Sequence, residues 1–386
     1  MPPATVVKYD HHRVLRIQID TKDQLDLLRM HERRLNLDYF SHHKVLGGHI
    51  DVRIAPEHFK DFEDLHLNYQ VRIENLQTVL DVEAKENALF QQKWEASRKN
   101  DEILDGKVPG NHLVENKDRV NAFASTASWF AGYHTYVDHQ TWLATQIKMH
   151  PKIAKISGAV VEYLIDQLLK GTDSRVAGYL AKYTFHIIPI MNPDGFVVTQ
   201  TSNRMHRKNA QSNGECLGTD TNRNWDCHWN EGGSSNDPCA DDYHGPSAFS
   251  SPEAANIANY LKSLPNVVSY IDFHSYSQMW MTPYGYIDTP PRSYDSYLKP
   301  LADGAVDALQ NVNGVSFTSG DIYNTIYPAT GSSVDYAYTI GVGAPFAVEL
   351  RDTGKHGFSL PASQIIPSGR ETWAAFTYIL DNLDIQ

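Results

Sequence analysis

The sequence of 386 residues has only three cysteines, no long apolar run and no excess of positive charge. Because no apolar stretch is long enough to cross a bilayer, we predict no membrane-spanning helix. The formal net charge of −12 argues against nucleic acid as a partner, since no basic surface is available to displace counterions from phosphates. The first residues, MPPATVVKYDHHRVLRI, lack a basic segment followed by an apolar core, so we expect no signal peptide in the chain.

The few cysteines bear on the compartment in which the protein folds. Cys216 and Cys239 flank a loop rich in glycine, serine and asparagine, which favours a disulfide made in an oxidising compartment and leaves Cys227 without a partner. Three free thiols in a cytosolic protein are the alternative.

The composition is that of a soluble globular protein, with 41% hydrophobic and 21% charged residues. Its length suits one large α/β domain and a smaller one. The stretch VVSYIDFHSY at 267–276 predicts a buried strand that ends at His274, and a helix is expected before it at 251–263. Strands that alternate with helices predict a mostly parallel sheet covered on both faces, with functional residues at the carboxyl ends of its strands.

The amino-terminal part predicts a small α+β unit followed by a polar connection. The unit has expected strands at 13–19, 49–54 and 69–73 and expected helices at 21–33 and 56–65. A polar helix at 78–99 leads into a polar loop at 100–121, which we take as a domain boundary. Exposed polar loops are preferred sites of proteolysis, so this loop is a candidate cleavage site, with an uncut linker as the alternative.

The remaining chain predicts alternating helices and strands. Helices are expected at 125–150, 159–169, 294–310 and 369–383, and buried strands at 183–190 and 346–350.

Four clusters of polar and aromatic residues stand out in this part of the chain. They are NPDGF at 192–196 with NRMHRK at 203–208, DTNRNWD at 220–226, DFHSYSQ at 272–278 with PYG at 283–285, and IYPATGSSVDYAY at 326–338 with VELRDTGKHGFSLPASQI at 348–365. In this order they resemble the zinc metallocarboxypeptidases of the pancreatic A/B type, and the first hundred residues resemble the activation peptide of that family. The resemblance covers nearly the whole chain.

The resemblance implies a fold and a domain organisation. The expected fold is α/β, with a mixed, mostly parallel twisted sheet flanked by helices, preceded by a small α+β open-sandwich pro-domain. The expected domains are a pro-domain at 1–77, a connecting helix and cleavable linker at 78–121, and a catalytic domain at 122–386. The implied protein is a secreted, monomeric zymogen that a protease activates at the linker and that acts on the C-termini of peptides and proteins.

The resemblance also assigns roles to residues that suit them chemically. Asn222 and Arg223 would hold the terminal carboxylate, which the planar fork of an arginine can bind with two hydrogen bonds. Arg207 would stabilise the oxyanion, and Glu349 would act as general base and then acid. The other implied substrate-binding residues are Arg204, Ser275, Tyr276, the mobile Tyr327, and Val334, whose apolar side chain, together with Ala329 and Ile322, implies a preference for apolar or aromatic C-terminal residues.

Each of these residues also has a purely structural interpretation. The arginines could belong to solvated polar loops, Glu349 could be a structural partner of Arg351, and His274 could be a core histidine.

The zinc site departs from the family pattern. His274 matches the third zinc ligand, but the expected His and Glu, three residues apart before the helix at 159–169, are absent because 156–158 run directly into Ala159. Neighbouring strands and a further substrate-binding arginine are missing with them. We interpret this as an internal deletion near 158–159, caused by a lost exon, a faulty gene model or a splice form. His112 and Glu115 have the ligand spacing but no preceding strand, and His274 alone would bind zinc weakly.

Two functional hypotheses follow from the sequence. The first is a zinc-dependent metallocarboxypeptidase with a preference for apolar and aromatic C-terminal residues. The second is a catalytically inactive relative that still binds peptide C-termini through Arg223. A cytosolic amidohydrolase is disfavoured, because the sequence lacks clustered His and Asp ligands.

Overall fold

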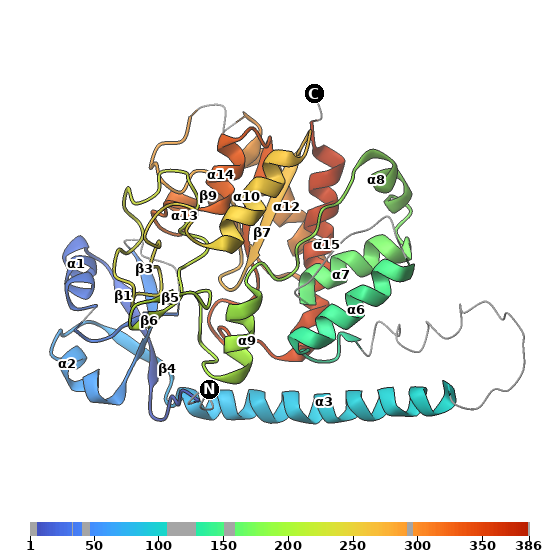
Figure 1. Ribbon diagram of the computed structural model, residues 1–386. Coiled ribbons are helices and arrows are strands. Elements are labelled where there is room, and N and C mark those ends of the chain that lie inside the picture. Colours follow the sequence, from blue (N-terminus) through green and yellow to red (C-terminus); the bar gives the residue numbers. More distant parts are fainter. Residues whose placement is uncertain are drawn as a thin grey trace, which may run out of the picture. The chain divides into compact units, whose positions relative to one another are not determined.

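The computed structural model describes residues 6–32, 34–40, 47–105, 129–149, 159–291 and 296–384 (Figure 1). Two compact units are present, one made of Met1–Thr78, Met191–Leu360 and Glu371–Gln386 and the other of Val79–Ile190 and Pro361–Arg370. The loop was predicted at 100–121, but residues 100–105 belong to helix α3 (Leu76–Asp105), so that part of the prediction is wrong because the polar helix predicted at 78–99 continues further. Residues 106–121, with His112 and Glu115, and the junction at 156–158 lie outside the described residues. The predicted domain boundaries therefore stay predictions.

The amino-terminal part of the first unit is a four-stranded antiparallel sheet in the order β2-β3-β1-β4. Apolar side chains alternate along β1, which buries Leu15, Ile17 and Ile19 against Leu25 and Leu28 of α1. Thr21 begins α1 as an N-cap, because its hydroxyl accepts from the backbone N–H of Gln24 and the Gln24 side chain bonds back. The elements are β1 (Arg13–Ile19), α1 (Lys22–His31), β2 (Asp38–Tyr39), β3 (Gly48–Ile54), η1 (Pro56–His58), α2 (Phe59–Glu63) and β4 (Tyr69–Ile73).

A second four-stranded sheet in the same unit has the order β7-β10-β8-β9. Its strands are β7 (Ser269–His274), β8 (Met279–Thr282), β9 (Thr318–Asp321) and β10 (Ala344–Glu349). The β7–β10 and β8–β9 pairs are parallel and the β8–β10 pair is antiparallel, so the predicted mixed, mostly parallel sheet is confirmed. In this order β7 is an outermost strand.

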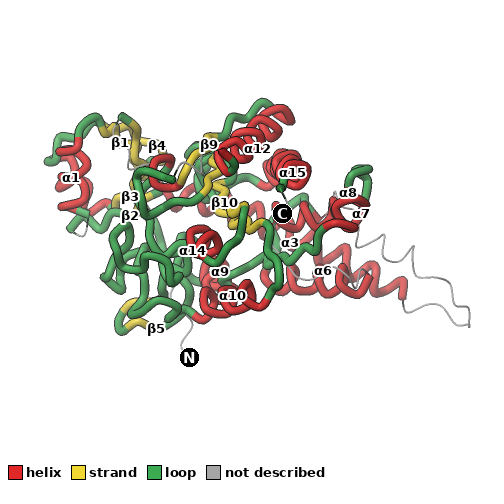
Figure 2. The backbone as a smooth tube through the Cα atoms, turned by 90° about the horizontal axis from the view of Figure 1, so that it is seen from above, coloured by secondary structure: helices red, strands yellow, loops and turns green. Residues whose placement is uncertain are grey.

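The two faces of this sheet carry different side chains because neighbouring residues of a strand point to opposite sides. One face carries Trp280, which contacts the rings of Phe273 and Phe346. The other face carries Met279 and Met281, which pack with Val334 at the start of α14 (Ser333–Thr339). Helix α12 (Leu298–Asn313) contacts β8 and β9, and α14 contacts β7 and β10. Figure 2 shows these two helices on opposite sides of the sheet.

The second unit contains a buried polar cluster around Glu162, a residue of α7 (Ala159–Lys170) whose accessible surface is 0%. Trp129 Nε1 donates to Glu162 Oε2 at 3.0 Å, and His139 Nδ1 lies 2.7 Å from Glu162 Oε1. The helix predicted at 159–169 is thus present, and its one buried carboxylate is fully engaged by neighbouring side chains.

The strand predicted at 183–190 is wrong. Among the described residues this segment forms no strand, and Ile188 is 46% exposed. An apolar run with high strand propensity becomes a strand only where another strand pairs with it, and local sequence does not reveal whether one does.

The other elements connect these parts of the fold. They are α3 (Leu76–Asp105), α6 (Tyr136–Met149), α8 (Val176–Lys182), α9 (Pro193–Thr201), β5 (Ser212–Asn213), β6 (Cys216–Leu217), α10 (Pro252–Ser263), α13 (Ile322–Thr325), η2 (Ala362–Gln364) and α15 (Ile365–Asn382). None of the helices in the described part of the chain combines the length and hydropathy of a membrane span.

Candidate active site

His274 and Glu349 lie side by side at the carboxyl ends of two parallel strands. They are register partners in the β7–β10 ladder, so both side chains point to the same face of the sheet. Glu349 is buried, with 7% of its surface exposed. The strand geometry alone therefore brings an imidazole and a carboxyl group together on the side that faces α14.

Asp272 precedes His274 by two residues on β7 and shares its face. His274 Nε2 lies 3.0 Å from Asp272 Oδ2, and the hydroxyl of Ser333 donates to the same carboxylate oxygen. Burial lowers the pKa of His274, but the ion pair with Asp272 outweighs burial and raises the pKa to about 9. Burial raises the pKa of Asp272, but His274 and Ser333 hold it below its usual value.

The loop after Asp220 places Asn222 next to the imidazole. The Asn222 side-chain oxygen accepts from the backbone N–H of Ser333 at 2.9 Å. Its side-chain nitrogen lies 3.2 Å from His274 Nε2. The Asn222 amide is therefore held between α14 and β7.

Arg223 is almost fully buried, with 4% of its surface exposed. Its Nη1 donates to the Asn222 carbonyl at 2.7 Å and its Nη2 donates to the Tyr327 hydroxyl at 2.6 Å. Within the described residues its Nε has no hydrogen-bond partner. A buried guanidinium with an unsatisfied donor is costly unless an acceptor reaches it, and a carboxylate is the acceptor that best matches its fork.

Arg207 lies on the other side of Asp220. Its Nε and Nη2 each lie 2.9 Å from Asp220 Oδ2, and its side chain is 31% exposed. Asp220 is buried, so this ion pair is partly shielded from water. The pairing leaves the Nη1 group of Arg207 outside the ion pair.

Glu349 has the titration behaviour expected of a proton-transfer group. Burial raises its pKa to about 7, even though His274 and Arg207 lower it. Its Oε2 is buried and has no hydrogen-bond partner among the described residues. A carboxyl group that titrates near neutral pH can accept a proton and return it.

An apolar cluster lies beside these polar groups. Val334 is 1% exposed and packs with Ile322 and Ala329, and Tyr327 packs against the same cluster. The predicted apolar residues and the predicted mobile tyrosine thus lie next to Arg223.

Of the other three predicted substrate-binding residues, two contact Phe358 and the third is the chain neighbour of one of them. Arg204 Nη2 donates to the Phe358 carbonyl at 2.8 Å, and the buried Tyr276 contacts the Phe358 ring edge to face. Ser275, next to Tyr276, is exposed. The structure therefore separates the predicted residues into an inner group around Arg223 and a second group around Phe358.

Comparison with known proteins identifies the family. The zinc carboxypeptidase family matches residues 149–375, and the carboxypeptidase activation peptide family matches residues 15–83. The chain belongs to the zinc carboxypeptidase family. It is a metallocarboxypeptidase of the peptide hydrolases by this membership, and the activation peptide marks a zymogen.

The relatives of this carboxypeptidase span nearly its whole length. It is 34% identical to carboxypeptidase A2 of Mus musculus over 386 residues, which covers 95% of this chain and 91% of the relative. It is 33% identical to a metallocarboxypeptidase A-like protein of Trichophyton verrucosum (strain HKI 0517), covering 99% of this chain and 95% of the relative. That alignment has 425 positions against 386 residues here, so at least 39 positions have no counterpart in this chain.

Solved structures show the same fold. The structure of thrombin activatable fibrinolysis inhibitor matches with a TM-score of 0.78 at 22% identity, covering 97% of this chain and 99% of the other. Carboxypeptidase A from Helicoverpa armigera matches with a TM-score of 0.76 at 23% identity, covering 97% of both chains. The predicted carboxypeptidase fold is confirmed.

The described residues of this carboxypeptidase do not fit a zinc ion. Among them, no group of three or more His, Cys, Asp or Glu side chains is placed to hold a metal. His274, the one predicted ligand, is instead engaged by Asp272. Catalytic zinc sites use three protein ligands, which the described residues do not supply together.

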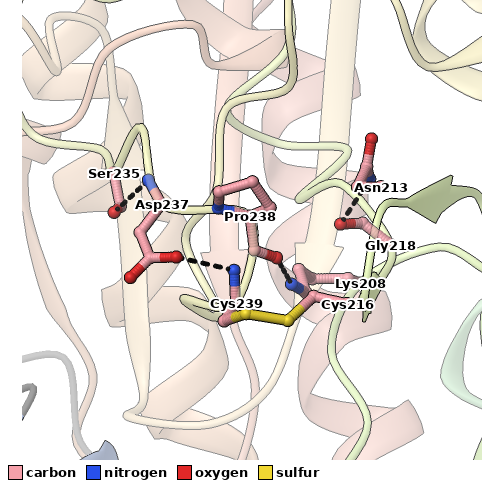
Figure 3. The surroundings of a disulfide bond; sticks show 8 residues. All are labelled: Lys208, Asn213, Cys216, Gly218, Ser235, Asp237, Pro238 and Cys239. Carbon is pink, nitrogen blue, oxygen red and sulfur yellow. Dashed lines mark hydrogen bonds between the residues drawn. A yellow bond between two sulfur atoms is a disulfide. The ribbon is translucent and has the colours of Figure 1, made fainter.

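The predicted disulfide is confirmed. Cys216 and Cys239 are joined, and Figure 3 shows the bond beside the hydrogen bond from Lys208 Nζ to the Pro238 carbonyl. Cys227 is a buried free thiol, and burial raises its pKa to about 11. A thiol in this state is unreactive at neutral pH.

Sequence reasoning missed three side chains that organise the site. Asp220 lies within the DTNRNWD cluster, and Asp272 has the two-residue spacing from His274 that puts both on one face of a strand. Those two signals could have found the carboxylates. No local signal identifies Ser333 as a partner of Asn222 and Asp272, because these contacts join residues far apart in the chain.

Proposed function

We propose that this protein acts on the C-terminal residues of peptides and proteins, with a preference for apolar and aromatic ends. The observation that carries the proposal is the buried Arg223 guanidinium, whose Nε lacks a hydrogen-bond partner among the described residues and which lies beside the apolar cluster around Val334. A free carboxylate next to an apolar side chain matches both features.

The surroundings of the inner group around Arg223 support the roles proposed for its residues. Arg223 and Asn222 bind the terminal carboxylate, and Tyr327 closes over it while Val334 contacts the terminal side chain. Arg207 presents its Nη1 group to the oxyanion that forms on the carbonyl oxygen of the peptide bond under attack. Glu349 accepts a proton from the attacking water and returns it to the leaving amine. Arg204, Ser275 and Tyr276 contact the preceding peptide residues.

In the family, zinc polarises the peptide carbonyl and lowers the pKa of its bound water. The described residues of this chain do not form that site. Peptide binding without hydrolysis is therefore the second candidate function, and the pairing of His274 with Asp272 favours it.

Three measurements on the purified full chain separate the candidates. They are zinc content, hydrolysis of benzoyl-Gly-Phe with and without chelator, and binding of benzoyl-Gly-Phe compared with its C-terminal amide. Stoichiometric zinc with chelator-sensitive hydrolysis supports the enzyme. A preference for the free acid without metal or hydrolysis supports the binding protein.

Arg223→Met tests the carboxylate contact itself. Loss of a buried charged partner costs about 2–5 kcal/mol, so the variant should bind the free acid roughly 30-fold or more weakly. The matched control is Arg29→Met, because Arg29 is 46% exposed on α1. Equal affinity of the unaltered protein for acid and amide would refute both candidate functions.

We further propose that the protein is a secreted, monomeric zymogen with a pro-domain at 1–77, a connecting helix and cleavable linker at 78–121 and a catalytic domain at 122–386. Contacts of the pro-domain support this. Phe40 packs on Phe358 with ring centroids 5.5 Å apart, and Arg16 Nη2 donates to the Thr353 carbonyl at 2.9 Å.

The Cys216–Cys239 disulfide suits an oxidising compartment. Cleavage within 78–121 by trypsin, followed by a gain in peptide binding, would test it.

A further inference from the structure

Asp220 is bonded to both arginines of the site and to the loop between them. Its Oδ2 accepts from Nε of Arg207 at 2.9 Å and lies 2.9 Å from Nη2 of the same guanidinium. Its Oδ1 accepts from the backbone N–H of Asn222 at 3.0 Å, and its carbonyl accepts from the backbone N–H of Arg223 at 3.0 Å. Its own N–H donates to the Tyr243 carbonyl at 2.9 Å, which fixes the residue on the protein.

The charges of the three side chains explain why a carboxylate is needed at this position. Arg207 and Arg223 are close enough to repel each other, and Asp220 attracts both. Two guanidiniums and one carboxylate leave a single net positive charge, which matches one incoming C-terminal carboxylate. Asp220 is 3% exposed, but the Arg207 side chain is 31% exposed, so this ion pair is partly shielded from water.

We propose that Asp220 is a positioning residue that holds Arg207 and Arg223 in a fixed relation, so that one guanidinium meets the terminal carboxylate of a peptide and the other meets the adjacent carbonyl. The proposal rests on the proposed function of the site. Asp220 itself does not touch the peptide. It acts through the ion pair with Arg207 and through the turn that aims Asn222 and Arg223.

Two substitutions separate these two connections. In Asp220→Asn, the Oδ1 acceptor for the Asn222 N–H is kept, but the amide nitrogen replaces the oxygen that faces the donors of Arg207. The ion pair with Arg207 and the charge attraction to Arg223 are then lost, while the bond to the loop is kept. Asp220→Ala removes both connections. The matched control is Asp226→Asn, because Asp226 is an exposed aspartate of the same sequence cluster.

The experiment measures the affinity of the full chain for benzoyl-Gly-Phe and for its C-terminal amide, together with the melting temperature. We expect the preference for the acid over the amide to fall at least tenfold in Asp220→Ala and by an intermediate factor in Asp220→Asn, with no change in Asp226→Asn. Binding of the amide should change less than binding of the acid.

Three other outcomes would overturn the inference. Tighter binding of the acid in both Asp220 variants would show that the carboxylate only neutralises charge. An equal loss of affinity for acid and amide, with a lower melting temperature, would show a purely structural role. An unchanged preference in both variants would show that Asp220 is not needed. If the unaltered protein shows no preference for the acid, the proposed function fails and the inference fails with it.

Discussion

Asp335 gives a stability prediction that depends on pH and is independent of any ligand. This residue is 1% exposed in the first turn of α14. Its carboxyl group accepts from the Gly285 N–H at 3.0 Å and from the Ser332 hydroxyl at 3.0 Å. Burial raises its pKa from 3.8 to about 6, because these two bonds only partly replace the lost hydration.

The sign of the effect follows from the raised pKa. The folded protein holds the proton more tightly than the unfolded chain, so ionisation destabilises the fold as pH rises from about 4 to about 6. A shift of about two pKa units corresponds to about 3 kcal/mol, which is fully lost above pH 6. Asp335→Asn removes this penalty, and its amide can still accept from Gly285 and donate to Ser332.

Urea unfolding at a series of pH values checks the prediction. The free energy of unfolding of Asp335→Asn should exceed that of the unaltered protein by up to about 3 kcal/mol at pH 7.5, and the gain should vanish near pH 4. Asp307→Asn on α12 is the matched control, because Asp307 is exposed and should change little at either pH. A difference for Asp335→Asn that stays constant between pH 4 and 7.5 would contradict the reasoning.

Three further predictions concern the fold. Reducing the Cys216–Cys239 disulfide, which spans 23 positions, should lower the free energy of unfolding by about 3 kcal/mol in denaturant titrations, and an unchanged midpoint would argue against it. Thr21→Ala removes the cap of α1 and should cost about 1 kcal/mol by the same assay, with no loss expected if the capping box is not formed in solution. Leu28→Ala, at a fully buried position of α1, should cost about 2–5 kcal/mol, whereas Met30→Ala, 73% exposed on the same helix, should cost little.

The sequence predicted elements where local patterns decide the structure. The capped helix that begins at Thr21 and the strands that end at His274 and Glu349 follow from capping residues and apolar periodicity. The four motif clusters also named residues that the fold brings together, since His274 and Glu349 are register partners and Asn222 approaches the imidazole.

The rest depends on contacts between distant parts of the chain. The run at 183–190 has strand composition but forms no strand within the described residues. The ion pair of Asp220 with Arg207 arises only when the loop folds back on an earlier segment. Local composition and residue spacing do not reveal which distant segments pair, so neither the missing strand nor the ion pair could be predicted from sequence patterns.

The place of β7 in its sheet has a consequence for handling the protein. It pairs with β10 on one side, and on its other side no strand pairs with it within the described residues. Its sequence, SYIDFH, contains neither proline nor lysine, the residues that commonly protect such borders. Backbone amides and carbonyls on that side, where no strand of the described residues pairs, can recruit extended segments from neighbouring molecules, so turbidity of concentrated solutions should rise with protein concentration. Ile271→Lys, at mid-strand, should suppress that association.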